Sequence, residues 1–133
     1  MSSTYKHRKH HLSLQSAISG ILLAFKAELN IKLIILFAIV TLAFGVAFQI
    51  SYMEWLAVIM AIMIVLLAEM INTSIESVTD LITKDWNEDA KAAKDIAGGM
   101  VLIACFGAFI IGLVIFLPRI LLLLKINYQF LTY

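Results

Sequence analysis

The sequence predicts an all-α membrane protein in which three transmembrane helices follow one amphipathic helix at the membrane surface. Of 133 residues, 62% are hydrophobic and only 14% are charged, and the mean hydropathy is +0.99. A soluble domain of this length exposes too much surface to hide so many apolar side chains. Three apolar stretches reach the length of about 20 residues that a bilayer crossing needs, and open strands would leave backbone groups unpaired in lipid.

The chain forms one domain over residues 1–133 and begins with a polar, basic tail over residues 1–11, which does not have the pattern of a removable signal peptide. Apolar residues then recur at helical spacing, so an amphipathic helix is expected to lie in the membrane interface over residues 12–30. The alternative is a simple extension of the first span. Glu28 and Lys32 at the junction favour a break instead.

The three spans are expected over residues 33–50, 55–71 and 96–117. The third span ends at Pro118, and residues 121–124 either continue its helix or lie at the interface. Positively charged residues precede the first span and lie between the second and third, whereas residues 51–54 contain no Lys or Arg. By the positive-inside rule, the N-terminus and the segment 72–95 face the cytoplasm. The net charge of +1 argues against a nucleic-acid partner.

The polar end of the second span is the most informative segment. At 100° per residue, one face spanning about 100° carries five polar side chains, so the span continues as a helix beyond the apolar stretch: Glu69, Asn72, Thr73, Glu76 and Asp80. Like charges four residues apart destabilise a helix, and carboxylate and amide oxygens suit Mg²⁺. An alternative is that Glu76 and Asp80 form the solvated face of a juxtamembrane helix.

Glu69 differs from the other carboxylates because it still lies within the apolar run. An ionisable side chain inside a span is costly and is treated as functional by default, and a carboxylate there suits a general base. A second cluster contains Lys91, Lys94, Asp95 and two glycines. These lysines could hold phosphates. Spacing alone instead favours lysines that mark the cytoplasmic side of the membrane and glycines that allow helices to pack closely. No Walker-type GxxxxGK[ST] loop is present.

Residues 69–80 resemble the signature helix of the small bacterial diacylglycerol kinase and undecaprenol kinase family, which has the form Glu-x-x-Asn-(Ser/Thr)-x-Ile-Glu-x-x-x-Asp. Residues 91–98 resemble the Ala-Lys-Asp box that follows it in the family. Residues between 17 and 30 match the spacing of the N-terminal helix of the family. The resemblance covers residues 13–118, and the acidic-amide pattern at the end of a span is specific.

This resemblance implies a homotrimer of three-span protomers in the bacterial inner membrane, with active sites shared between neighbours at the cytoplasmic interface. The implied reaction is the ATP- and Mg²⁺-dependent phosphorylation of a lipid hydroxyl. Glu69 would be the general base, and Glu28 and Glu76 would hold the metal ions.

The same resemblance implies that Asn72 lies beside the metal ligands and that Lys94 contacts the phosphates. Asp95 would help to hold the nucleotide, and Asp80 would have a supporting role there. The chain departs from the family at residues 84–87, where Lys-Asp-Trp-Asn replaces an acidic-Tyr-His sequence. Trp86 could stack on the adenine ring or anchor the helix at the membrane interface, and the anchor is slightly favoured.

The family also usually reads Glu-Arg-Asn-Phe-Arg where residues 28–32 read Glu-Leu-Asn-Ile-Lys, so the resemblance does not extend to contacts made by that arginine and aromatic ring. A small proton- or cation-coupled transporter is the alternative function, but a carrier should show polar groups through the midplane. A non-enzymatic assembly subunit would leave the polar face unexplained. Between the two lipids, the Pro118-Arg119 ending resembles that of family members from Gram-positive bacteria, and this resemblance implies undecaprenol as the substrate.

Overall fold

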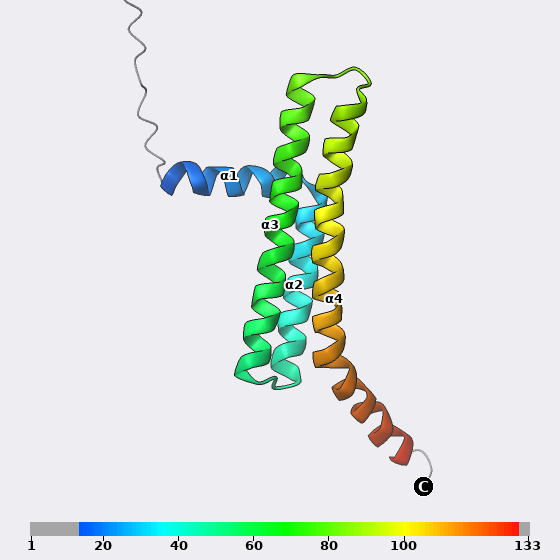
Figure 1. Ribbon diagram of the computed structural model, residues 1–133. Helices are drawn as coiled ribbons and strands as arrows, with labels where there is room; N and C mark the ends of the chain where they lie inside the picture. Colours follow the sequence, from blue (N-terminus) through cyan, green and yellow to red (C-terminus); the bar gives the residue numbers. More distant parts are fainter. Residues whose placement is uncertain (1–13, 131–133) are drawn as a thin grey trace, which may run out of the picture.

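A computed structural model describes residues 14–130, with side chains for residues 14–26 and 28–124. It contains four helices: α1 (Leu14–Ala27), α2 (Leu29–Ala47), α3 (Tyr52–Ile82) and α4 (Glu88–Phe130). The helices α2, α3 and α4 form a bundle, and α1 projects sideways from it (Figure 1). The three bundle helices are long and apolar enough to cross a membrane, which confirms the predicted all-α fold with three apolar helices of spanning length. The predicted basic tail lies outside the described residues.

A break in the backbone separates α1 from α2. Glu28 adopts an extended conformation with φ −109° and ψ 126°, and its N–H still donates to the carbonyl of Ala24 at 3.2 Å. The amphipathic segment is therefore a helix of its own and not an extension of the first span. It ends at Ala27, three residues earlier than the sequence predicts.

The turn between α2 and α3 begins earlier than the sequence predicts. Helix α2 ends at Ala47, not at Ile50, and its 19 residues span about 28 Å, close to the thickness of a bilayer core. Gln49 has a φ of 51° in the turn. Ser51 then begins α3 with a capping box, because its N–H donates to the Glu54 carboxylate at 2.7 Å and its hydroxyl accepts from the Glu54 N–H at 3.4 Å.

Helix α3 continues without interruption for 31 residues, as expected from the polar face beyond its apolar part. Helix α4 also begins well before its apolar part, because the Asn87 side chain accepts from the Ala90 N–H at 2.9 Å and caps its first turn. The helix continues past Pro118 and turns away from the bundle toward its C-terminal end (Figure 1). Proline removes one backbone donor and favours such a bend.

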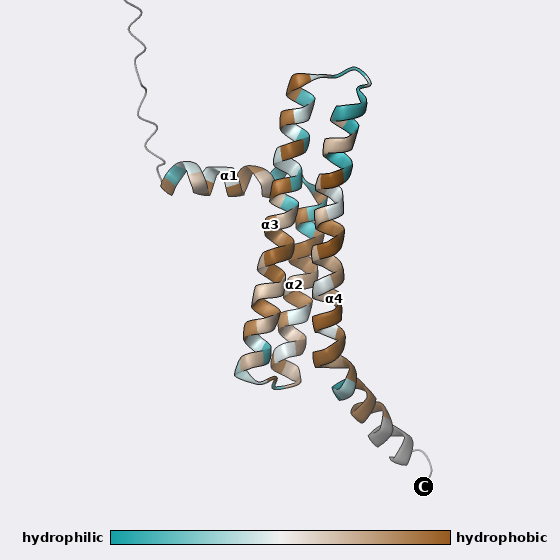
Figure 2. Ribbon diagram, viewed as in Figure 1, coloured by the Kyte–Doolittle hydropathy of each residue, from teal (hydrophilic) through white to brown (hydrophobic). Residues whose placement is uncertain are grey.

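The two ends of the bundle differ in polarity (Figure 2). Apolar residues cover its membrane-length part, where Ile50, Val58 and Ile115 form a buried cluster with Trp55 packed against it. Polar residues gather around the connection between α3 and α4 (Figure 2). Within one chain, only 6% of the most apolar stretch of α4 is buried, so lipid or other copies of the chain must cover the rest.

Candidate active site at the polar end of α3 and α4

Glu69 lies where the apolar part of α3 gives way to its polar extension. Only 2% of this residue is exposed, and no residue in the part of the chain that the structure describes forms a hydrogen bond or ion pair with its carboxylate. Burial of a carboxylate without a partner is unfavourable. Its position therefore calls for a chemical role, and a buried carboxylate at the membrane boundary suits proton abstraction.

Asn72 and Glu76 follow one and two turns later on the same face of α3. The Asn72 amide nitrogen donates to the Glu76 carboxylate at 3.0 Å. Asn72 is 7% exposed, and its side-chain carbonyl oxygen is buried without a partner among the described residues. Because a buried amide oxygen usually has a partner, the unpaired oxygen points to a ligand that the isolated chain does not supply.

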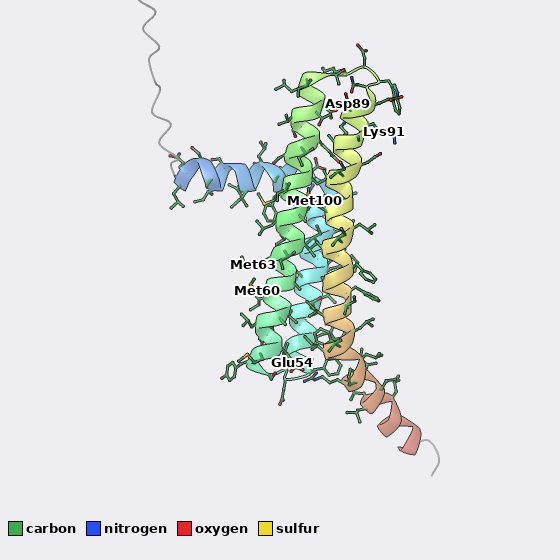
Figure 3. All side chains as sticks on the ribbon, in the orientation of Figure 1. Glu54, Met60, Met63, Asp89, Lys91 and Met100 are labelled. Carbon is green, nitrogen blue, oxygen red and sulfur yellow. The ribbon has the colours of Figure 1, made fainter. Side chains whose placement is uncertain are left out.

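Two lysines of α4 lie near the C-terminal end of α3, and each is paired with a carboxylate. The Lys94 ammonium contacts Asp80 across the two helices at 2.5 Å. Lys91 (labelled in Figure 3) pairs with Asp95 along α4 at 2.8 Å. The hydrogen bond that Lys91 donates to the Asp95 carboxylate raises the pKa of Lys91, which lies outside the predicted span. Both lysines are thus paired with carboxylates.

These residues line an open pocket of about 340 Å³ between the ends of α3 and α4. Its charged lining consists of three lysines and three aspartates, which balance to zero: Lys84, Lys91, Lys94, Asp80, Asp85 and Asp95. Thus the pocket can direct individual N–H donors at an anion, but it brings no excess positive charge of its own. A polyphosphate bound there needs additional cations for neutralisation.

Glu28 lies at the break between α1 and α2, is partly buried and makes no side-chain cap to α2. Among the described residues, no group of three or more His, Cys, Asp or Glu side chains is placed to hold a metal ion. The oxygen donors at Glu76 and Asn72 nevertheless fit a hard cation, which commonly takes its remaining ligands from water and substrate phosphates. The Glu28 and Glu76 metal assignment stays a prediction.

Trp86 lies in the connection beyond α3, and 78% of it is exposed. The rise of α3 from Glu69 to Ile82 is about 20 Å, and this end of α3 extends beyond the level of α1 (Figure 1). The ring lines the charged pocket, a position compatible with stacking on a nucleotide base, and the role of Trp86 as an interface anchor stays a prediction.

The pocket also includes residues whose contribution the sequence analysis missed. Asn87 was considered only as a departure from the family, but it caps α4 and lines the pocket. An asparagine directly before Glu88 and Asp89 is a helix-start signal that could have revealed this role. The pairing of Lys91 with Asp95 follows the helical spacing of four residues and could also have been anticipated.

Comparison with known proteins is consistent with this arrangement. Residues 15–116 match the family model described as prokaryotic diacylglycerol kinase. The chain is 37% identical over 101 residues to an undecaprenol kinase of Bacillus subtilis (strain 168), covering 76% of this chain and 82% of that protein. It is 32% identical over 117 residues to a diacylglycerol kinase of Synechocystis sp. (strain ATCC 27184 / PCC 6803 / Kazusa), covering 85% of this chain and 65% of that protein. The matched segment contains the buried glutamate, the amide-carboxylate pair and the charged pocket. The chain therefore belongs to the prokaryotic diacylglycerol kinase family of membrane lipid kinases.

Proposed function

We propose that this lipid kinase transfers the terminal phosphate of ATP to a lipid hydroxyl at the cytoplasmic face of the bacterial inner membrane. The observation that carries the proposal is the order of groups along α3. The buried Glu69 lies at the membrane boundary, the Asn72–Glu76 pair follows, and the Asp80–Lys94 contact at the pocket comes last. From Glu69 to Asp80 the helix rises by about 16 Å. A lipid hydroxyl and a nucleotide can therefore approach one helix face from opposite ends.

Glu69 is proposed to accept the proton of the lipid hydroxyl while the hydroxyl oxygen attacks the terminal phosphorus, and ADP leaves with the electrons of the broken bond. A lipid hydroxyl stays near the headgroups, so the proton acceptor must lie at the boundary of the apolar region, as Glu69 does. Phosphoryl transfer depends mainly on positioning and charge neutralisation. A general base adds a factor of about 10²–10⁴.

The nucleotide is proposed to be held by Lys94 at its phosphates and by Asp95, with Asp80 in support. Mg²⁺ ions would be held by Glu76 and Glu28, with Asn72 beside them, and supply the positive charge that the balanced lysines and aspartates of the pocket lack. Trp86 is proposed to stack on the base, and the support for this is that its exposed ring lines the same pocket. The assignments within residues 69–80 and 91–98 agree with the family resemblance of these two segments, whereas Trp86 lies where the chain departs from the family.

A homotrimer with shared active sites is proposed as the working form. Within one chain, Glu69 and the Asn72 oxygen lack partners among the described residues, and most of the apolar surface of α4 is uncovered. A neighbouring copy could cover this surface and complete the metal site. The basic residues that precede the first span and follow the second favour a cytoplasmic N-terminus, with α1 lying in the interface.

The lipid substrate is proposed to be undecaprenol, with diacylglycerol as the alternative. The family contains relatives named for each lipid, and the relative named undecaprenol kinase has the higher identity of the two. An apolar groove of about 400 Å³ between α2, α3 and α4 does not discriminate between the two types of chain.

The direct test is phosphate transfer from labelled ATP in detergent micelles, with undecaprenol and diacylglycerol offered side by side, with and without Mg²⁺. We expect labelled undecaprenyl phosphate that depends on Mg²⁺. Transfer to diacylglycerol alone would reverse the substrate assignment. A folded protein that labels neither lipid would contradict the kinase proposal and favour a transporter instead.

A further inference from the structure

Among the side chains that the structure describes, two ion pairs join α3 to α4, one near each end of their contact. Glu54 pairs with Arg119 at the end next to the α2–α3 turn, and Asp80 pairs with Lys94 at the polar end. Only the second pair lines the charged pocket. Lys94 is proposed above to contact phosphate, so its partner controls where the ammonium group lies before a nucleotide arrives.

The ammonium group of Lys94 has three N–H donors, and Asp80 accepts from it through one oxygen at 2.5 Å. Two donors therefore remain for a phosphate without loss of the Asp80 contact. The Lys94 side chain is 37% exposed, and a free lysine at such a position would sample many rotamers. A carboxylate that restrains it in advance lowers the entropy lost when the phosphate binds.

We infer that Asp80 is a positioning residue that acts on the nucleotide only through Lys94, by holding its ammonium group at the pocket. This inference rests on the proposed kinase function. It assigns Asp80 neither a metal nor a direct nucleotide contact. The second lysine of the pocket differs, because Lys91 is restrained by Asp95 within the same helix and does not connect α4 to α3.

The test is a double-mutant cycle on nucleotide binding to the full-length protein in micelles, using Mg²⁺ and a non-hydrolysable ATP analogue without lipid. Asp80→Asn should weaken binding about fivefold, the upper range for an exposed ion pair. In a Lys94→Met background, Asp80→Asn should have no further effect, because the side chain it acts through is gone. Asp80→Glu should restore part of the affinity. Asp89→Asn, which changes an exposed carboxylate of α4 (Figure 3), is the matched control.

Steady-state kinetics give the second readout. Asp80→Asn should raise the KM for Mg-ATP and leave kcat and the KM for the lipid unchanged. Equal losses in the parent and Lys94→Met backgrounds would show that Asp80 contacts the ligand or metal itself and would overturn the inference. A fall in thermal stability with unchanged nucleotide affinity would reduce the pair to a structural link and also overturn it. If the parent protein binds no nucleotide at all, the proposed function itself fails, which is a distinct result.

Discussion

The two ends of the α3–α4 pair are built from similar side chains that are used differently. At the end near the α2–α3 turn, the Glu54 carboxylate accepts from the Ser51 N–H and from Arg119. The Arg119 side chain also donates to the carbonyl of Ile115, one turn before the proline bend. At the polar end, the buried Glu69 carboxylate has no partner among the described residues, and neither has the Asn72 oxygen.

This difference separates a carboxylate that stabilises the fold from one that is available for chemistry. Around Glu54, the helix start and the ion pair satisfy the charge, and an apolar cluster of Ile50, Val58 and Ile115 packs at the same end of the bundle. The Glu69 side chain, in contrast, is buried, and no hydrogen bond or ion pair among the described residues offsets the burial of its carboxylate. Unsatisfied polar groups are costly to keep, so they indicate a site that a ligand or a neighbouring chain completes. The contrast can be tested by substituting residues at each end.

The largest effect is expected for Glu69→Gln. The amide has the same shape but cannot accept the hydroxyl proton, so kcat should fall at least about a hundredfold, while Mg-nucleotide binding survives. Initial rates and binding of an ATP analogue measure the two effects. The control is Glu54→Gln, in the first turn of the same helix, which should keep most of the activity of the folded protein. Lost binding with normal turnover per bound nucleotide would remove Glu69 from the base role.

Glu76→Ala should weaken Mg-nucleotide affinity at least about tenfold, because removal of a residue that only orients a metal ligand already causes a loss of this size and Glu76 is proposed to be a ligand itself. It also leaves the Asn72 amide without its acceptor at 3.0 Å. Titration with Mg²⁺ at fixed ATP should show a higher half-saturating concentration. Glu88→Ala, on the exposed first turn of α4, serves as the control. Affinity equal to that of the parent would rule out the metal-ligand assignment.

At the packed end, Gly45→Ala should destabilise the protein by about 1–3 kcal/mol, the usual range for overpacking. A methyl group at Gly45 would lie 2.7 Å from the Trp55 ring, and a ring held between helices has little room to move. Thermal unfolding in detergent measures the loss. Gly107→Ala is the matched control, since open space surrounds that position. Similar unfolding temperatures for the two variants would argue against close packing of Trp55 on α2.

The smallest effect is expected for the Glu54–Arg119 pair. A double-mutant cycle with Glu54→Gln and Arg119→Gln should give a coupling of about 0.5–1 kcal/mol in unfolding, because both side chains are more than a quarter exposed. Kinase activity of the folded variants should remain near the parent level. A large loss of activity would mean that the two ends communicate and would weaken the division between them.

Much of the fold was predictable because local patterns govern it. The three apolar helices, the separate amphipathic helix and the uninterrupted polar extension of α3 follow from hydropathy, helical periodicity and the need to satisfy backbone groups in lipid. The boundaries were less accurate. Capping at Ser51 and Asn87, together with the left-handed Gln49, decided where α2 ends and where α3 and α4 begin.

The candidate site also has features that the sequence predicted and features that only the structure revealed. The amino-acid sequence by itself determined the carboxylate face of α3 and the family resemblance, since both depend on residue types at fixed spacing along one helix. Only the tertiary structure decided that Lys94 pairs with Asp80, fourteen positions away, and that Trp86 lines the same pocket as this pair. Those results depend on how two helices are aligned by the length and capping of their connection, and side-chain periodicity within one helix carries no information about that alignment.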